Sequence, residues 1–308
     1  MTRWGVLSTA NINRLVLEGA RLAHGVDIVA VASRDASRAT AYARQHDIER
    51  AHGSYEALLA DERIDAVYIP LPNSLHHEWT LRALEAGKHV LCEKPYSRRA
   101  VDAEEAFDVA ERSGLVLSEA FMWRHNPQTQ RFLDLLPEIG ELQTIRATFG
   151  FVLHNPENVR LRADLDGGAL MDVGCYCVGG ARLLAGEPKR VHGEQVVGST
   201  GVDIRFTGLL RFDGGVTVEF TASLTHEHQG LEAIGSEGTL FAPDPWHCFD
   251  GVIVVNGREE RLRPENSYKL QLENVSAAIR GEAPLLLGRD DAVAQAATIE
   301  ALYASAAG

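Results

Sequence analysis

Residues 4–12, Trp4-Gly5-Val6-Leu7-Ser8-Thr9-Ala10-Asn11-Ile12, begin a pattern in which short apolar runs alternate with stretches of helical spacing. The further apolar runs lie at 26–33, 66–70, 89–93 and 115–118, and the helical stretches at 12–24, 36–46, 74–86 and 100–113. Such alternation is typical of a doubly wound parallel sheet. The run Ile28-Val29-Ala30-Val31-Ala32 also has the unbroken apolar character of a strand buried on both faces.

The second part of the chain has a different texture. Polar and apolar residues tend to alternate at 142–151, 202–212 and 216–224, which favours half-buried strands. Asp213-Gly214-Gly215 joins the last two runs and predicts a hairpin, because these residues tolerate positive φ. Helical spacing returns at 170–185, 268–280 and 290–305. We therefore predict an α/β chain with a doubly wound domain over 1–120 and an α+β domain with an open, mainly antiparallel sheet over 121–308.

Size and charge narrow the class of protein. A chain of 308 residues exceeds the length at which a single core usually stops growing. A net charge of −13, from 43 acidic and 30 basic residues, disfavours nucleic acid as a partner. No stretch is typical of a signal peptide or a membrane span, so we expect a cytoplasmic protein. Its four cysteines are too few for a disulfide framework, and we expect reduced thiols.

The turn after the first apolar run is the first candidate binding site. In doubly wound sheets, a dinucleotide pyrophosphate meets a helix N-terminus at this turn. Here Ser8, Ala10 and Asn13 take the three glycine positions of the usual G-x-G-x-x-G, so the motif alone is weak and a turn that binds nothing is equally consistent. The candidate cofactor residues of this turn are Ser8, Thr9, Ala10, Asn11 and Ile12.

The end of the second apolar run indicates which dinucleotide would bind. An acidic residue here would bind the ribose hydroxyl of NAD, but this chain has Ser33 and Arg34, with Arg38 one helical turn later. Guanidinium groups suit a 2′-phosphate, so NADP is favoured over NAD. Asp35 is evidence against this interpretation, and Arg38 could instead lie on a solvated helix face.

Two neighbouring segments carry a family signature. Leu71-Pro72-Asn73-Ser74-Leu75-His76 follows one apolar run, and Glu93-Lys94-Pro95 ends the next. These segments resemble the Gfo/Idh/MocA family of oxidoreductases, whose Glu-Lys-Pro signature matches residues 93–95. The carboxyl end of the sheet is also where such folds bind ligands, although a lone lysine there could be an ordinary surface residue. Further cofactor candidates are Leu71, Pro72, Asn73, His76, Glu93 and Lys94.

The second signature is Gly167-Gly168-Ala169-Leu170-Met171-Asp172-Val173-Gly174-Cys175-Tyr176. On a helix, Asp172 and Tyr176 would lie one turn apart on the same face. The family usually has His at the second position, and Tyr176 resembles the subgroup that contains D-xylose dehydrogenase, dimeric dihydrodiol dehydrogenase and glucose-fructose oxidoreductase. A tyrosine that only packs in the core is the alternative.

The same resemblance extends to the segments around Trp123, Arg124 and Arg160, which are candidate substrate-binding residues. Trp123 could give a sugar an apolar platform, and either arginine could donate to its hydroxyls, but each could equally be structural.

No metal is predicted, because neither Cys175-x-Cys177 nor His226-Glu227-His228 comes with the three or four convergent ligands of a zinc site.

The resemblance covers essentially the whole chain and implies a Rossmann domain followed by an open-sheet domain. It implies hydride transfer between NADP and a carbinol carbon of a sugar, such as C1 of D-xylose, or of a cyclic polyol. Tyr176 would take the hydroxyl proton. A free tyrosine has a pKa of about 10, which the Lys94 ammonium would lower, and Asp172 would orient the sugar or Lys94.

Two alternatives stay open for the function. A trans-dihydrodiol or inositol-type dehydrogenase would keep the cofactor and the three catalytic residues. A non-catalytic NADP-binding regulator would bind the cofactor without turnover. In this family the outer face of the open sheet commonly forms a dimer interface, so a homodimer or higher homo-oligomer is expected.

Overall fold

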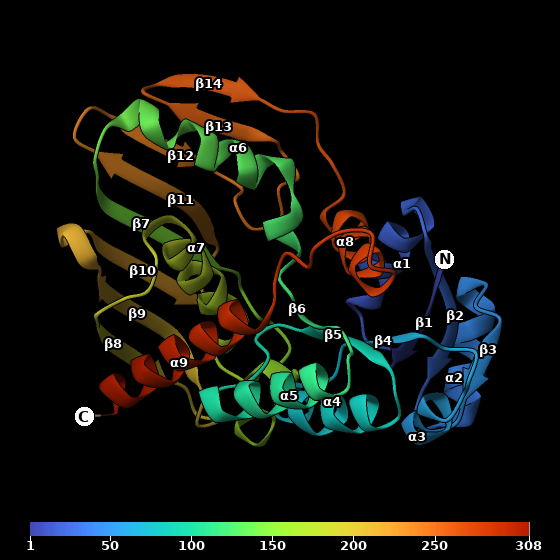
Figure 1. The fold of residues 1–308 in the computed structure, drawn as a ribbon. Coiled ribbons are helices and arrows are strands. Elements are labelled where there is room, and N and C mark those ends of the chain that lie inside the picture. The colour runs from blue at the N-terminus through green and yellow to red at the C-terminus, as the bar shows by residue number, and fades with distance from the viewer. Residues whose placement is uncertain (308) are drawn as a thin grey trace. The chain divides into compact units, whose positions relative to one another are not determined.

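The computed structural model describes residues 1–307 and divides the chain into two compact units (Figure 1). The first unit contains residues 1–97, 101–122 and 266–293. The second unit contains residues 98–100, 123–265 and those from 294 onward. A segment from late in the sequence thus belongs to the first unit. The boundary at 120 and the roles expected of the two predicted domains stay predictions.

The first unit is built on a six-stranded sheet whose strands are all parallel, in the order β3-β2-β1-β4-β5-β6. Its strands are β1 (Thr2–Leu7), β2 (Val26–Ala32), β3 (Arg50–His52), β4 (Ala66–Ile69), β5 (His89–Glu93) and β6 (Leu117–Ala120). Its helices are α1 (Asn13–Leu22), α2 (Ala36–His46), α3 (Tyr55–Leu59), α4 (His76–Glu85), α5 (Ala100–Arg112) and α8 (Ser267–Ile279). This strand order is that of dinucleotide-binding folds, and it confirms the predicted doubly wound sheet.

Helix α8 packs on α1 through a glycine. A Cβ at Gly19 would come within 2.7 Å of the Lys269 backbone nitrogen and 2.8 Å of the Tyr268 Cβ. The buried Trp4 indole also donates to the Ser276 hydroxyl over 3.0 Å. These contacts explain why a segment so late in the sequence is part of the first unit.

The second unit has an eight-stranded sheet in the order β14-β13-β12-β11-β7-β10-β9-β8. Its strands are β7 (Leu142–Gly150), β8 (Arg190–Val197), β9 (Asp203–Arg211), β10 (Thr217–Ser223), β11 (His228–Gly235), β12 (Thr239–Ala242), β13 (Val252–Val255) and β14 (Arg258–Arg261). Its helices are α6 (Pro127–Leu135), α7 (Cys175–Ala185) and the later turns of α9 (Arg289–Ala306). Every neighbouring pair is antiparallel except β7 with β10, so the predicted mainly antiparallel sheet is confirmed.

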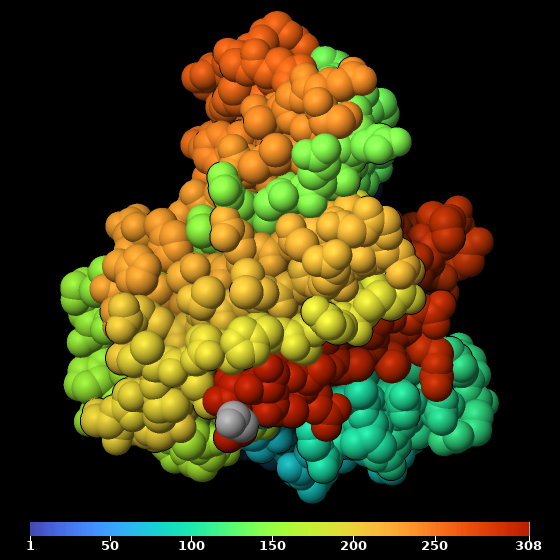
Figure 2. Space-filling model, turned by 90° about the vertical axis from the view of Figure 1, so that its left-hand side faces the viewer, coloured from blue at the N-terminus to red at the C-terminus, as the bar shows by residue number. Residues whose placement is uncertain are grey.

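Register explains the two faces of this sheet. One row across neighbouring strands is apolar and buried, with Leu240, Ala233, Ile145, Val218 and Leu210 side by side. Helix α7 lies against one face of the sheet (Figure 1). The next row along the strands is exposed or half-buried and consists of Phe241, Glu232, Arg146, Glu219 and Leu209. The yellow and gold atoms of this part of the chain lie together on the surface that Figure 2 shows.

Local signals explain several turns. Gly214 and Gly215 have φ of 71° and 86° in the β9–β10 connection, which confirms the predicted hairpin. Strand β3, helices α3 and α6, and strands β8 and β11 to β14 were not predicted. Short 3-10 turns lie at Asn73–Leu75, Met122–His125, Leu136–Ile139, Val159–Leu161, Ala163–Leu165 and Asp213–Gly215.

Candidate functional site

The predicted cofactor residues gather at one edge of the parallel sheet. Ser8 follows β1, Ser33 follows β2, Leu71 lies just beyond β4, and Lys94 follows β5. These four strands are neighbours in the order β2-β1-β4-β5, and the carboxyl ends of parallel strands share one edge. Residues 9–12 form the turn that leads into α1.

The turn after β1 has the backbone of a glycine turn without the glycine. Ser8 has a φ of 146°, a region that side chains rarely adopt. Its hydroxyl accepts from the Ala10 amide over 3.2 Å and donates to the Pro70 carbonyl over 3.4 Å. The Asn13 side-chain Nδ2 donates to the Ser8 carbonyl over 2.8 Å. Three polar contacts therefore hold a conformation that glycine would adopt at no steric cost.

Asp35, the residue that counted against NADP, is used as a helix cap. Its carboxylate accepts from the Ser37 amide over 2.8 Å and from the Arg38 amide over 3.2 Å. The Ser37 hydroxyl and these amides lower the Asp35 pKa. Arg34 and Arg38 are exposed, and both favour the charged form of the Tyr55 hydroxyl, although burial raises the Tyr55 pKa overall. The carboxylate is therefore engaged in capping and does not count against NADP, and the binding of a 2′-phosphate by the two arginines stays a prediction.

His76 connects the two signature segments of the first unit. The ring is fully buried, with Nδ1 3.0 Å from the Pro95 carbonyl and Nε2 2.8 Å from the Leu71 carbonyl. Burial lowers the His76 pKa, even though both carbonyls favour the charged form. The ring thus connects Pro95, the residue after Lys94, to Leu71, just beyond β4. Pro72 and Asn73 are half-buried beside it.

The Glu-Lys-Pro segment is held by buried groups. Tyr68 donates to the Glu93 carboxylate over 2.6 Å, and burial raises the Tyr68 pKa well above its usual value. The next residue, Lys94, is half-buried, and the Lys94–Pro95 peptide bond is cis. The Tyr96 amide donates to Glu119 on β6 over 2.8 Å.

The second signature is not the regular helix that its spacing predicted. Residues Leu170–Gly174 form a π-helical turn, in which the Cys175 amide bonds to the Leu170 carbonyl, and α7 continues from Cys175. Asp172 lies in the π turn and Tyr176 in the first turn of α7. Such turns are rare and frequently occur at functional sites.

Tyr176 is almost buried, at 7% exposure, among aromatic rings of the second unit. Its ring lies edge-on to Phe149, with centroids 5.1 Å apart, and 6.1 Å from Trp246. Trp246 donates to the Thr148 carbonyl over 2.8 Å, and Gly180 on α7 leaves room for its ring. Phe149 and Trp246 were missed, because they lie far from Tyr176 in the sequence and belong to no motif.

The predicted substrate residues all have partners within the second unit. Arg160 Nε donates to the Asp172 carboxylate over 2.6 Å. The Arg124 Cζ lies 5.7 Å from the centroid of the Trp123 ring. Trp123 is 1% exposed, and its ring is edge-on to Trp246. Their contact with a substrate stays a prediction.

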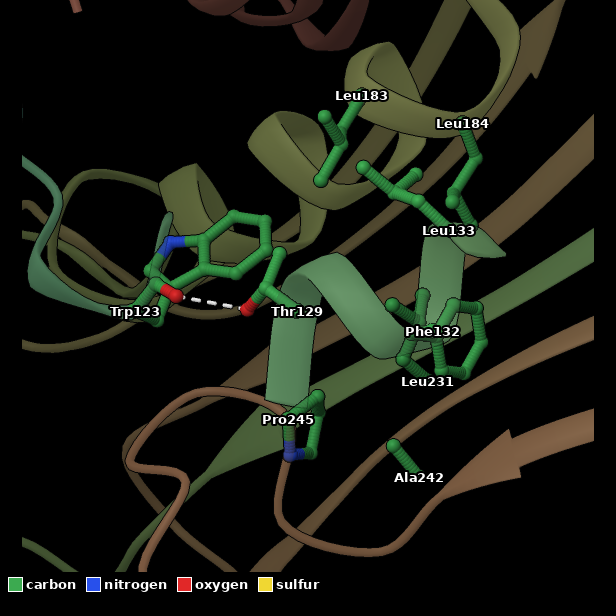
Figure 3. A pocket seen from close by; sticks show the side chains of 9 residues that line it. All are labelled: Trp123, Thr129, Phe132, Leu133, Leu183, Leu184, Leu231, Ala242 and Pro245. Atoms are coloured by element: carbon green, nitrogen blue, oxygen red, sulfur yellow. Dashed lines mark hydrogen bonds between the residues drawn. The ribbon is translucent and has the colours of Figure 1, made fainter. Parts of the chain in front are cut away.

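Figure 3 shows a pocket of the second unit that has the wrong chemistry for a sugar. Its polar side chains are few, and the Thr129 hydroxyl already donates to the Trp123 carbonyl over 2.7 Å. A sugar needs several donors and acceptors, so this pocket is better explained as a gap in core packing. Its lining residues are Trp123, Thr129, Phe132, Leu133, Leu183, Leu184, Leu231, Ala242 and Pro245.

Asp203 anchors the segment that carries the second signature. It is 3% exposed, accepts from the Leu170 amide over 2.7 Å and from the Tyr303 hydroxyl over 2.8 Å. Burial raises the Asp203 pKa to about 6, although both hydrogen bonds favour the carboxylate. Asp203 belongs to none of the sequence motifs and was not predicted as a site residue.

The described residues contain neither a metal-binding cluster nor a membrane-spanning helix. Across residues 1–307, no three or more His, Cys, Asp or Glu side chains form a group that could hold a metal ion. The four cysteines are buried thiols. None of the described helices has the length and apolar character needed to cross a bilayer.

Comparison with known proteins identifies the family. Residues 3–121 match the model of an oxidoreductase family with an NAD-binding Rossmann fold, and residues 137–241 match the Gfo/Idh/MocA C-terminal domain. The chain is 39% identical to D-xylose 1-dehydrogenase (NADP(+)) 2 of Haloferax volcanii, over 98% of this chain and 97% of the relative. It is 32% identical to trans-1,2-dihydrobenzene-1,2-diol dehydrogenase of Xenopus tropicalis, over 85% of this chain and 81% of the relative.

A solved structure is similar throughout. A 3-ketoreductase from Actinomadura kijaniata, in complex with NADP and TDP-benzene, superposes with a TM-score of 0.93 at 30% identity, over 99% of this chain and 97% of that one. The protein therefore belongs to the Gfo/Idh/MocA family of oxidoreductases, and the resemblance noted in its sequence is confirmed.

Proposed function

We propose that this protein is an NADP-dependent dehydrogenase that oxidises a carbinol carbon of a sugar, with C1 of an aldose such as D-xylose as the first candidate. The observation that carries the proposal is the pair of intact signatures, Lys94 after β5 and Asp172 with Tyr176 at the start of α7. The relative with 39% identity is a D-xylose 1-dehydrogenase that uses NADP.

The first unit supports NADP as the cofactor. The Ser8 turn would receive the pyrophosphate at the N-terminus of α1. Arg34 and Arg38 would bind the 2′-phosphate, since Asp35 is engaged as the α2 cap. When bound, NADP supplies the acceptor for the hydride of the carbinol carbon. Relatives solved with NADP have the same fold.

The remaining chemistry belongs to the side chains of this protein. Tyr176 would accept the proton of the substrate hydroxyl as the carbinol carbon is oxidised. A nearby Lys94 ammonium would favour the phenolate and stabilise the developing alkoxide. Asp172 would orient the sugar hydroxyl or the ammonium, without carrying the proton itself. The Phe149 and Trp246 rings would exclude water from the Tyr176 hydroxyl.

A flat dihydrodiol is the second candidate substrate. The rings of Phe149 and Trp246 beside Tyr176 would pack against a planar carbocycle as well as against a sugar face. Dihydrodiol dehydrogenases are also among the relatives, at 32% identity in Xenopus tropicalis. The chemistry at Tyr176 would be the same in both cases.

Absorbance at 340 nm tests both candidates. The purified protein is mixed with NADP, and in parallel with NAD, against a panel of aldoses, inositols and trans-dihydrobenzenediol. We expect reduction of NADP with an aldose. Turnover with the dihydrodiol alone would select the second candidate. Tight NADPH binding with no turnover in either direction would favour the non-catalytic regulator.

We also propose that the protein is a homodimer through the outer face of its eight-stranded sheet. Leu209 and Val196 expose 53% and 43% of their surface on this face, and Phe241 is exposed on the same face, with three strands between its strand β12 and β9. Light scattering should give twice the mass of the 33.6 kDa chain. A monomer at micromolar concentration would reject the proposal.

A further inference from the structure

Arg160 is held at both ends of its backbone. The Asn158 side chain accepts from the Arg160 amide over 3.0 Å, and the Arg160 carbonyl accepts from the Gly168 amide over 2.9 Å. Arg160 also lies in a short 3-10 turn, Val159–Leu161. The residue is therefore fixed to the segment that carries Asp172 before its side chain makes any contact.

The glycine pair of the signature permits this close approach. A Cβ at Gly167 would lie 2.4 Å from the Arg160 carbonyl oxygen. A Cβ at Gly168 would lie 2.1 Å from a carboxylate oxygen of Asp203, and φ there is 128°. Both glycines are thus required by packing: one by the segment that carries Arg160, the other by the Asp203 anchor.

The guanidinium of Arg160 is directed at Asp172. Its Nε donates over 2.6 Å, and its Cζ lies 5.7 Å from the Phe151 ring. The Asp172 side chain is 14% exposed, whereas that of Arg160 is 41% exposed. An ion pair with one exposed partner contributes little to stability, so its main effect is on the direction and charge of the carboxylate.

We propose that Arg160 is a positioning residue, which fixes the Asp172 carboxylate as an anion in the orientation that the reaction needs. The inference rests on the proposed function, in which Asp172 orients the substrate or Lys94. It changes the role expected of Arg160, from a donor to sugar hydroxyls to a residue that acts through Asp172.

Arg162 provides a matched control in the same loop. It also forms an ion pair with a nearby aspartate, with Nε 3.0 Å from Asp164 Oδ1. Both partners are exposed, at 55% and 63%. Removing the Arg162 charge therefore tests the general effect of losing a cation and an ion pair from this loop.

The experiment measures kcat, KM for the sugar and NADPH affinity for Arg160→Gln, Arg160→Lys, Arg162→Gln, Asp172→Asn and the Arg160→Gln/Asp172→Asn double variant. We expect Arg160→Gln to lower kcat about 10- to 100-fold, with NADPH affinity unchanged. Arg160→Lys keeps the charge but not the planar donor, so its kcat should be intermediate. Arg162→Gln should stay within about twofold of the native protein. The double variant should be no slower than Asp172→Asn, because Arg160 acts through Asp172.

A different pattern would overturn the inference. If Arg160→Gln raises KM alone, and if its effect multiplies with that of Asp172→Asn, then Arg160 binds the substrate directly. Hydrogen exchange of the 168–176 peptide needs no substrate, and it should be faster in Arg160→Gln than in Arg162→Gln. A native protein without turnover rejects the proposed function, and the exchange rates then decide on Arg160. Equal exchange in the two variants would reject the positioning role.

Discussion

The turn after β1 and the segment before α7 differ in where glycine is used. In the turn, Ser8 takes a φ of 146° although no glycine is present, and hydrogen bonds hold it there. In the segment, Gly167 and Gly168 are present because a Cβ would overlap Arg160 and Asp203. The turn is mostly half-buried and lies at the same sheet edge as the exposed arginines Arg34 and Arg38 after β2, whereas the segment before α7 is buried and fixes side chains. We therefore expect changes in the turn region to alter cofactor binding, and changes in the segment to alter catalysis or stability.

The largest effect should come from the buried segment. Tyr176→Phe keeps the ring that packs on Phe149 and removes only the hydroxyl. We expect kcat to fall about a thousandfold, since general base catalysis contributes about 10²–10⁴. NADPH affinity, measured by fluorescence titration, should change less than about twofold. Near-normal turnover would remove Tyr176 from the mechanism and break the division between the two regions.

Gly168→Ala should cause the next largest change. The added Cβ would overlap the Asp203 carboxylate in a backbone with φ of 128°, so we expect a loss of about 3 kcal/mol in the free energy of unfolding. Urea unfolding followed by tryptophan fluorescence measures it. Gly186→Ala is the control, because φ is 82° there but nothing lies within 4 Å of the added Cβ. The control should cost less, about 1–2 kcal/mol from backbone strain alone, and equal costs would show that packing against Asp203 is unimportant.

Asp203 should make the buried segment sensitive to pH. Its folded pKa of about 6 lies above the usual 3.8, so the folded state binds the proton more tightly than the unfolded state. Its contribution to stability is therefore greatest below about pH 4, and it falls as the pH rises to 6, by roughly 2–3 kcal/mol. Asp203→Asn should remove this fall, so the variant should gain stability relative to the native protein between pH 4 and 6. Urea unfolding at a series of pH values measures the free energy of unfolding of both proteins. If that free energy changes with pH in the same way for both between pH 4 and 6, the assignment is wrong.

Arg34 and Arg38, after the strand that neighbours β1, should control the choice of cofactor. Replacing both Arg34 and Arg38 with Ala should weaken NADPH binding by about 30-fold, roughly 2 kcal/mol, and leave NADH binding unchanged. Arg44→Ala is the control, since Arg44 is exposed in the last turn of α2, the helix that contains Arg38. Fluorescence titration with both nucleotides measures the change. An equal loss for NADH and NADPH would show that the arginines do not recognise the 2′-phosphate.

The same two regions show how much of the fold and of the site can be predicted from the sequence. The parallel strands were predicted because strands buried on both faces are continuous apolar runs, whereas β3 has only three residues, Arg50-Ala51-His52. Local signatures located Lys94, Asp172 and Tyr176. The partners of these residues could not be found this way. Trp246 and Asp203 reach the segment before α7 through tertiary packing, which leaves no pattern in neighbouring residues.

The π turn also could not be predicted from the sequence. The spacing of Leu170 and Val173 fits an α-helix, and a π turn differs from it in backbone hydrogen bonding rather than in which residues are apolar. The Asp35 cap is a similar case. Its position suggested a ribose ligand, and only the bonds to the Ser37 and Arg38 amides showed another use for the carboxylate.

The smallest effect tests the strain at Ser8 directly. Ser8→Gly and Ser8→Ala both remove the hydroxyl, but only the alanine keeps a Cβ at φ of 146°. At ordinary positions alanine is more stabilising than glycine by about 0.5–1 kcal/mol. We expect the reverse order at Ser8, with the glycine variant about 1 kcal/mol more stable in urea unfolding. The same pair of substitutions at Ser37, in the first turn of α2, should show the ordinary order. If alanine is the more stable residue at both positions, the turn stores no strain, and the two regions differ only in that close packing requires glycine in the segment before α7.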